Sequence, residues 1–267
     1  MSGTFRTFEI SDPRFESDGL RWVTVKSAAL KGRADITLWV PPGGKPAGMV
    51  LLLHGVYGSH WAWALKGGAH RTAERLMKSG DVPPMVLAMP SDGLWGDGSG
   101  YWKHAERDFA RWIVEEVPAA VLQAVPSLER SAPRFIAGLS MGGYGALRLG
   151  CGHPGAFAAV SGHSSITQFE QLAGFVEEPL ESYGPGEGSP DVLDVVLANR
   201  DRLPRIRFDC GTEDPLIGAN RALSRALESA GIPHEYREYA GGHEWPYWET
   251  HLAETLRYFG SATRSCG

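Results

Sequence analysis

The sequence has little cysteine and no excess of basic charge. Its 267 residues include only three cysteines, Cys151, Cys210 and Cys266, which are too few and too widely spaced for a disulfide scaffold or a zinc site. We expect small buried or terminal thiols at these positions. The formal net charge is −5, which gives no basic surface for nucleic acid. These shortages argue against the disulfide-rich, zinc-binding and nucleic-acid-binding classes.

The sequence also lacks a long apolar run. Its start, MSGTFRTFEISDPRF, has no apolar core of the length that a secretory signal needs, and no later segment offers about 18 uninterrupted apolar residues for a membrane span. We therefore expect a cytoplasmic protein without a membrane partner. Secretion stays open only if a signal has been removed from the chain.

The overall composition is that of a globular protein. Hydrophobic residues make up 43% of the chain and charged residues 21%, which argues against disorder. The length suits one large core or two small domains, and we favour a single domain over residues 1–267. A small insertion is predicted at about 165–199, around the loop-forming sequence GPGEGSP. The sequence leaves open whether this insertion acts as a lid.

Short segments with strand character recur along the chain, and helix-length stretches separate most of the later ones. This alternation predicts an α/β protein with a mostly parallel central sheet and helices on both faces. A short polar link joins the first two segments, which predicts an antiparallel N-terminal hairpin at the sheet edge. The predicted strands are 22–27, 36–40, 49–53, 85–89, 135–137, 158–161, 206–210 and 235–239.

Helices are predicted where apolar residues recur at helical spacing, notably over 103–117 and in the last part of the chain around 248–259. The loops that follow parallel strands gather at the carboxyl edge of a sheet, where ligands bind. Four such loops carry unusual polar and aromatic residues: 54–63, 90–102, 211–216 and 240–248.

The sequence GLSMG at 138–142 follows the buried segment 135–137 and precedes a helix-like stretch. A sharp strand-to-helix turn strains the backbone so that its central serine projects outward, and the flanking glycines remove side chains that would clash. Ser140 is therefore the candidate nucleophile.

A serine nucleophile needs a base that takes its proton and an acid that orients the base. In α/β-hydrolases the chain order is Ser, then Asp or Glu, then His. His243 is the candidate base, because it lies in a glycine-rich turn between a strand and the last predicted helix. Asp214, in the loop after the strand 206–210, is the candidate acid, with Glu213 and Asp209 as alternatives. Because His243 must be neutral to accept a proton, we expect activity to fall at acid pH.

The remaining histidines after the nucleophile are His153, His163, His234 and His251. We expect His251 on the last helix and His234 at the start of a strand to pack or to face solvent. His153, which precedes a proline, is typical of a helix end.

The oxyanion that forms on the attacked acyl group needs backbone N–H donors that already point at it. Met141 supplies one donor at the start of the helix after the nucleophile. We predict that the N–H of Val56, in the loop HGVYG at 54–58, supplies the other. We expect His54 to be a structural hydrogen-bonding residue, because no metal-ligand spacing accompanies it. No metal or other cofactor is expected.

Six segments, HGVYGS, PSDGLWGDGSGY, GLSMGGYGAL, HPGAFAAVSG, DCGTEDPL and GGHEW, extend over the chain from about residue 49 to the last helix. Together they resemble the esterase D family of α/β-hydrolases, which includes tributyrin esterases, feruloyl esterases and S-formylglutathione hydrolases. The resemblance implies an α/β-hydrolase fold with the triad Ser140, Asp214 and His243 and the oxyanion donors Val56 and Met141.

One position departs from part of that family. S-formylglutathione hydrolases carry a cysteine shortly after the oxyanion-loop glycine, whereas this chain reads VYGS at 56–59. This departure argues against a glutathione thioester as the substrate. A thioesterase of that kind and an acyltransferase on the same scaffold stay as alternatives, and a non-catalytic binding scaffold is the least favoured one.

Tryptophan is concentrated in or beside the predicted carboxyl-edge loops. Rings near a catalytic serine can hold an aryl acyl group or the face of a sugar. We predict a serine carboxylesterase that acts on short acyl or aryl esters, including acetyl or feruloyl esters of carbohydrates. The oligomeric state, a homo-oligomer included, is left open. The predicted substrate-binding residues are Tyr57, Trp61, Trp95, Tyr101 and Trp245.

Overall fold

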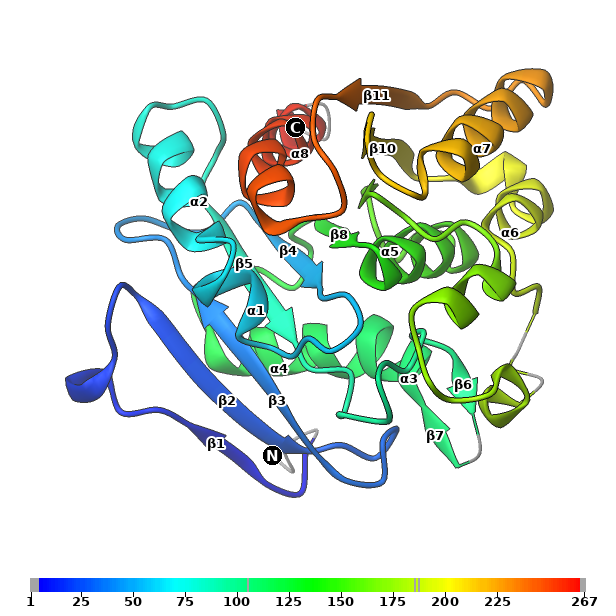
Figure 1. Ribbon diagram of the computed structural model, residues 1–267. Helices are drawn as coiled ribbons and strands as arrows, with labels where there is room; N and C mark the ends of the chain where they lie inside the picture. The colour runs from blue at the N-terminus through cyan, green and yellow to red at the C-terminus, as the bar shows by residue number, and fades with distance from the viewer. Residues whose placement is uncertain (1–4, 105, 185, 187, 265–267) are drawn as a thin grey trace.

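The structure is a computed structural model that describes residues 5–104, 106–184, 186 and 188–264. Within these residues a nine-stranded sheet has the spatial order β1-β2-β3-β5-β4-β8-β9-β10-β11 (Figure 1). Neighbours from β5 to β11 in this order are parallel, and the β1, β2 and β3 end is antiparallel. The strands are β1 (Phe8–Ile10), β2 (Leu20–Lys26), β3 (Arg33–Trp39), β4 (Gly48–Leu53), β5 (Met85–Pro90), β8 (Arg134–Leu139), β9 (Ala159–His163), β10 (Arg205–Gly211) and β11 (Glu235–Tyr239).

The two faces of the sheet carry separate apolar layers. Along β4, Val50 and Leu52 point into the layer beneath α1, α2 and α8, whereas Leu51 and Leu53 point into the layer beneath α4, α5, α6 and α7. This alternation buries the whole strand and confirms the predicted parallel sheet with helices on both faces. The helices are α1 (Ala62–Leu65), α2 (Ala69–Lys78), α4 (Val117–Ala124), α5 (Met141–Gly152), α6 (Val192–Ala198), α7 (Ile217–Ser229) and α8 (Trp245–Arg264), with short 3-10 turns η1 (Pro13–Phe15) and η5 (Arg200–Arg202).

The predicted N-terminal hairpin is present but does not form the edge of the sheet. Strands β2 and β3 pair antiparallel from Leu20 opposite Trp39 to Lys26 opposite Arg33. The three-residue strand β1 pairs outside β2 and forms the edge. The antiparallel N-terminal edge of the sheet is as predicted, but β1 itself was not, because a three-residue strand with two exposed side chains has no apolar pattern.

The helix predicted over 103–117 begins later and is not regular. The residues 103–108 instead contain a small antiparallel hairpin of β6 (Lys103–His104) and β7 (Arg107–Asp108). The carboxylate of Asp108 accepts the N–H of Arg111 and caps α3 (Phe109–Arg111). A π-helical turn, η2 (Trp112–Glu116), then leads into α4, where Pro118 has no N–H for a regular helical hydrogen bond.

The predicted insertion at 165–199 contains η3 (Phe169–Gly174), η4 (Leu180–Tyr183) and α6. As expected, Cys151 and Cys210 are buried free thiols, and Cys266 lies outside the described residues. Of the helices described, none has both the length and the apolar character needed to cross a membrane.

Candidate active site

Ser140 lies between β8 and α5 with a backbone conformation that few residues adopt. Its φ of 55° and ψ of −119° lie outside the regions open to most side chains, at a cost of about 1–3 kcal/mol. A Cβ on Gly138 would overlap the carbonyl of Gly142, and a Cβ on Gly142 would overlap the carbonyl of Leu53. The N–H of Ser140 donates to the carbonyl of His163 at 2.9 Å. The turn is thus fixed by packing and by the neighbouring strand.

The predicted base and acid both meet this serine at the carboxyl edge of the sheet. His243 lies in the loop between β11 and α8, and Asp214 lies in the loop between β10 and α7. Nε2 of His243 is 3.0 Å from Oγ of Ser140, and its Nδ1 is 2.8 Å from Oδ2 of Asp214. With the proton on Nδ1 donated to Asp214, Nε2 can accept the proton of the serine.

The carboxyl group of Asp214 is buried, and both of its oxygens have hydrogen-bond partners in the protein. Its second oxygen, Oδ1, accepts the N–H of Leu216 at 2.8 Å. Burial by itself raises the pKa of this carboxyl, but the hydrogen bond and charge of His243 and the Leu216 N–H outweigh it and hold the pKa below its ordinary value. Asp214 is therefore anionic at neutral pH and can stabilise a protonated His243.

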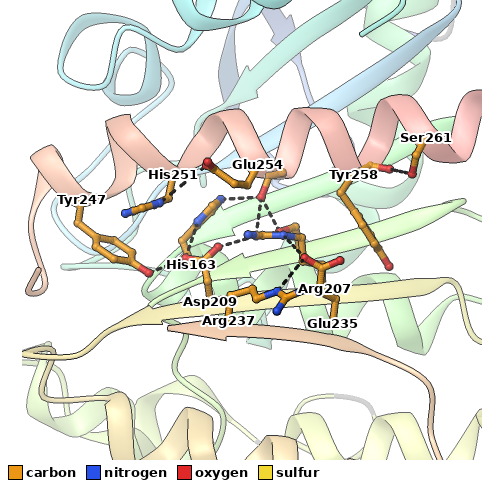
Figure 2. A network of polar contacts seen from close by, with 12 residues as sticks. His163, Arg207, Asp209, Glu235, Arg237, Tyr247, His251, Glu254, Tyr258 and Ser261 are labelled. Carbon is orange, nitrogen blue, oxygen red and sulfur yellow. Dashed lines mark hydrogen bonds and ion pairs between the residues drawn. The ribbon is translucent and has the colours of Figure 1, made fainter. Parts of the chain in front are cut away.

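The two alternative acids lie elsewhere. The side chain of Glu213 is exposed. Asp209 is fully buried and belongs to a separate polar network (Figure 2). Its Oδ1 accepts Nδ1–H of His163 at 3.0 Å and the hydroxyl of Tyr247 at 2.9 Å, and its Oδ2 accepts the guanidinium of Arg207.

Thr255 closes this network, since its hydroxyl lies 3.0 Å from Nε2 of His163 and 3.1 Å from Nη1 of Arg207. The network joins β9, β10 and α8. Its last member on β10, Asp209, lies five residues before Asp214, and its first member on α8, Tyr247, lies four residues after His243. The Asp209 carboxylate is engaged by His163, Tyr247 and Arg207, whereas Asp214 is the acid that contacts His243.

The two predicted oxyanion residues flank the nucleophile. Met141 is the first residue of α5, and the first N–H groups of a helix have no carbonyl partner inside it. Val56 lines the cavity that contains Ser140. His54 holds this loop, because its Nδ1–H donates to the Gly55 carbonyl at 2.7 Å and its Nε2 accepts the N–H of Asp92 at 3.1 Å.

A cavity of about 440 Å³ opens over Ser140 and His243. Of the predicted substrate-binding residues, Tyr57, Trp61 and Trp245 line it. The rings of Trp245 and Trp248 meet edge to face at 5.4 Å, and the ring of His243 meets Trp248 in the same way at 5.1 Å. The described residues that line it are Gly55, Val56, Tyr57, Gly58, Trp61, Ala62, Lys66, Leu139, Ser140, Phe175, His243, Glu244, Trp245 and Trp248.

Two predicted substrate-binding residues do not line this cavity. Tyr101 is fully buried, and its hydroxyl donates to the carbonyl of His54 at 3.1 Å. This hydrogen bond supports the loop 54–58, which contains the predicted oxyanion donor Val56. Trp95 packs its ring against His104 at 4.2 Å and Tyr183 at 4.9 Å. Both lie in the expected loop, but the side-chain directions in an irregular loop follow no sequence period.

Sequence reasoning missed Phe175, Lys66 and Glu244. Phe175 comes from the insertion, and its ring lies 5.5 Å from that of His243. The Nζ of Lys66 lies 5.3 Å from the centre of the Trp245 ring. Phe175 follows a short 3-10 turn that has no apolar repeat, so no sequence signal connected it with the site.

The chain is similar to known esterases. It is 27% identical over 231 residues to an acetyl esterase from Caldicellulosiruptor saccharolyticus, a match that covers 79% of this chain and 83% of that protein. A solved ferulic acid esterase superposes with a TM-score of 0.76 at 24% identity, over 96% of this chain and 100% of that chain. An S-formylglutathione hydrolase from Staphylococcus aureus superposes with a TM-score of 0.75 at 21% identity, over 94% and 98% of the two chains.

The two structural likenesses confirm the predicted α/β-hydrolase fold. The sequence profile of the Esterase family matches residues 27–259. This range includes Ser140 and the two residues that form a hydrogen-bonded chain with it, His243 and Asp214. The chain belongs to the Esterase family and is a carboxylic ester hydrolase.

Proposed function

We propose that Ser140, Asp214 and His243 form the catalytic triad of a serine carboxylesterase for short acyl or aryl esters. The observation that carries this proposal is the position of His243, hydrogen-bonded through one ring nitrogen to Asp214 and through the other to Ser140. A serine hydroxyl becomes a nucleophile only when such a base is within reach, and an oriented imidazole serves this role on many folds.

In the proposed reaction His243 takes the proton of Ser140 as Oγ bonds to the acyl carbon, and Asp214 stabilises the imidazolium. The N–H groups of Val56 and Met141 stabilise the oxyanion. Nε2 then protonates the leaving alcohol as the ester bond breaks. A water molecule, deprotonated by the same nitrogen, attacks the acyl-enzyme and releases the acid and Ser140.

The cavity favours an aromatic or carbohydrate-linked substrate. Three tryptophans and a phenylalanine form its walls, and flat rings bind an aryl acyl group or the apolar face of a sugar. The acetyl esterase and ferulic acid esterase to which the chain is similar suggest acetyl and feruloyl esters as the first compounds to try. The absence of cysteine from the sequence VYGS at 56–59 still argues against a glutathione thioester.

The test is hydrolysis of p-nitrophenyl acetate, butyrate and octanoate by the wild type and by Ser140→Ala. We expect turnover that is fastest on the short chains and that falls by about 10³-fold or more in the variant. Activity that survives the substitution would overturn the assignment of Ser140. Added alcohols, with analysis of the products, separate hydrolysis from acyl transfer, because a transferase would form the new ester.

We also propose that the chain forms one domain, since the strands from both ends of the sequence join the same sheet. A cytoplasmic location, the absence of a nucleic-acid partner and the oligomeric state stay predictions. Cell fractionation and sedimentation of the purified protein test the first and the last.

A further inference from the structure

The loop 93–98 contacts the proposed oxyanion loop through Asp97. The carbonyl of Asp97 accepts the N–H of Tyr57 at 2.7 Å, and its Oδ2 lies 3.4 Å from the Tyr57 hydroxyl. Tyr57 has a φ of 57°, a left-handed conformation that disfavours side chains larger than glycine. Because Tyr57 follows Val56 directly, the bond from its N–H to Asp97 fixes the backbone next to the proposed oxyanion donor.

Asp97 also binds the insertion through a reciprocal pair of contacts. Its carboxylate accepts the N–H of Glu177 at 2.7 Å, while its own N–H donates to the carboxylate of Glu178 at 3.1 and 3.2 Å. Gly96 makes this approach possible, since it has a φ of +52° and any Cβ there would overlap the Glu178 carboxylate. Hydrogen bonds that involve a carboxylate are stronger than neutral ones, so these contacts hold the two loops together.

The same segments contact the reacting groups. Phe175, two residues before Glu177, packs against His243 and lines the cavity. Gly98, the residue after Asp97, lies so close to Met141 that a Cβ would be 2.5 Å from the Met141 sulfur and 3.3 Å from a methyl group of Val56. Loop 93–98 therefore touches both proposed oxyanion residues and the segment that carries the Phe175 wall.

The geometry points to Asp97 as a positioning residue for the ester hydrolysis. Its carbonyl fixes the oxyanion loop, and its carboxylate fastens that loop to the Phe175 segment, so the position of the oxyanion donors depends on the insertion. This inference rests on the proposed function of Ser140 and Val56. A catalytic donor displaced by about 1 Å can lose up to about 10²-fold in rate.

The experiment compares Asp97→Ala, Asp97→Asn and Glu178→Ala with the wild type on p-nitrophenyl acetate, and measures the affinity of a phenylboronic acid, which forms a tetrahedral adduct with a serine. We expect Asp97→Ala to lower kcat about tenfold with KM within about twofold, and to weaken boronate binding by a similar factor. Asp97→Asn keeps an oxygen acceptor for the Glu177 N–H and should recover at least half of kcat. Asp201→Ala, an exposed acid in η5, is the matched control and should behave as the wild type.

Glu178→Ala removes the acceptor from the insertion side without changing the oxyanion loop, and it should lower kcat in the same direction. If the thermal midpoint of Asp97→Ala shows that this variant does not fold, the kcat of Glu178→Ala tests the inference instead. A kcat within twofold of the wild type in both alanine variants, or a rise in KM alone, would overturn the inference. Ser140→Ala is assayed beside them: activity in that variant refutes the proposed function, whereas loss there with an unchanged kcat in Asp97→Ala refutes only the role of Asp97.

Discussion

Asp214 illustrates how one buried carboxylate can be kept charged. Its side chain is shielded from water, yet His243 and the Leu216 N–H keep its pKa below the ordinary value. The anion holds the proton of His243 on Nδ1, which leaves Nε2 facing Ser140 as the acceptor. The orientation of the imidazole therefore depends on a single charge.

Replacing Asp214 by asparagine should remove that charge with little change in shape. An amide can donate to Nδ1, which favours the wrong tautomer of His243, and we expect kcat to fall by about 10³- to 10⁴-fold. Steady-state kinetics on p-nitrophenyl acetate measure this, with Glu213→Gln as the matched exposed neighbour. A loss below tenfold for Asp214→Asn would contradict the assignment of the acid.

Trp61 is the most accessible aromatic ring of the three cavity tryptophans, at 39% exposure. Trp61→Ala should lower kcat/KM for a feruloyl ester about tenfold, because a planar acyl group loses its stacking surface, and should change the value for p-nitrophenyl acetate less than threefold. Leu65→Ala, an exposed position of α1 outside the cavity lining, is the control. Equal losses on both esters would mean that Trp61 supports the fold and does not select the substrate.

Among the elements, the strand–turn–helix unit of β8 and α5 is closely packed, with backbone atoms within 2.3 Å of where a Cβ would lie at Gly138 and Gly142. Helix α5 approaches the end of β4 so closely that only glycine fits at position 142. This proximity brings the start of the helix, and the N–H of Met141, to the nucleophile.

Gly142→Ala should therefore push α5 away from β4. We expect activity to be lost and the free energy of unfolding to fall by about 1–3 kcal/mol, the usual cost of overpacking. Gly218→Ala in α7 has open space around the new methyl group and should leave activity unchanged with slightly higher stability. Urea denaturation of both variants provides the comparison, and a fully active Gly142→Ala would show that the helix can move without cost.

The elements also show where sequence reasoning works. The central parallel strands β4, β5 and β8 could be predicted because they are buried, mainly apolar runs. The loops that follow the parallel strands place Ser140, Asp214 and His243 at one edge of the sheet. The β6–β7 hairpin, the edge strand β1 and the cavity wall at Phe175 were missed. They depend on strand pairings of only two or three residues or on contacts between distant loops, and such contacts leave no periodic pattern in the chain.

On the scale of the whole molecule, the buried network of Asp209, His163 and Arg207 makes stability depend on pH. Burial raises the pKa of Asp209, but His163 and Arg207 outweigh it and lower the pKa to about 2, from an ordinary value of 3.8. Since the folded pKa is the lower one, the ionised carboxylate stabilises the fold above about pH 4, and this contribution is lost as the pH falls from about 4 to about 2.

Asp209→Asn should thus be less stable than the wild type by about 3–5 kcal/mol at pH 7, because it removes the buried carboxylate that contacts the buried guanidinium of Arg207. The difference should shrink by about 1 kcal/mol between pH 5 and pH 3, as the wild type loses its own contribution. Urea unfolding at both pH values measures it, with Asp201→Asn as the exposed control. A difference that stays constant with pH would show that Asp209 does not titrate in this range.

The hydrogen bond between His243 and Ser140 joins residues 103 positions apart. A ribosome releases the N-terminal part of a chain first, so the nucleophile turn can fold well before its base exists. The newly made protein therefore gains esterase activity only after the segment that carries His243 has been made and has folded. During refolding, the return of activity should mark the moment at which β11 and α8 dock, later than the signals that report formation of the central sheet.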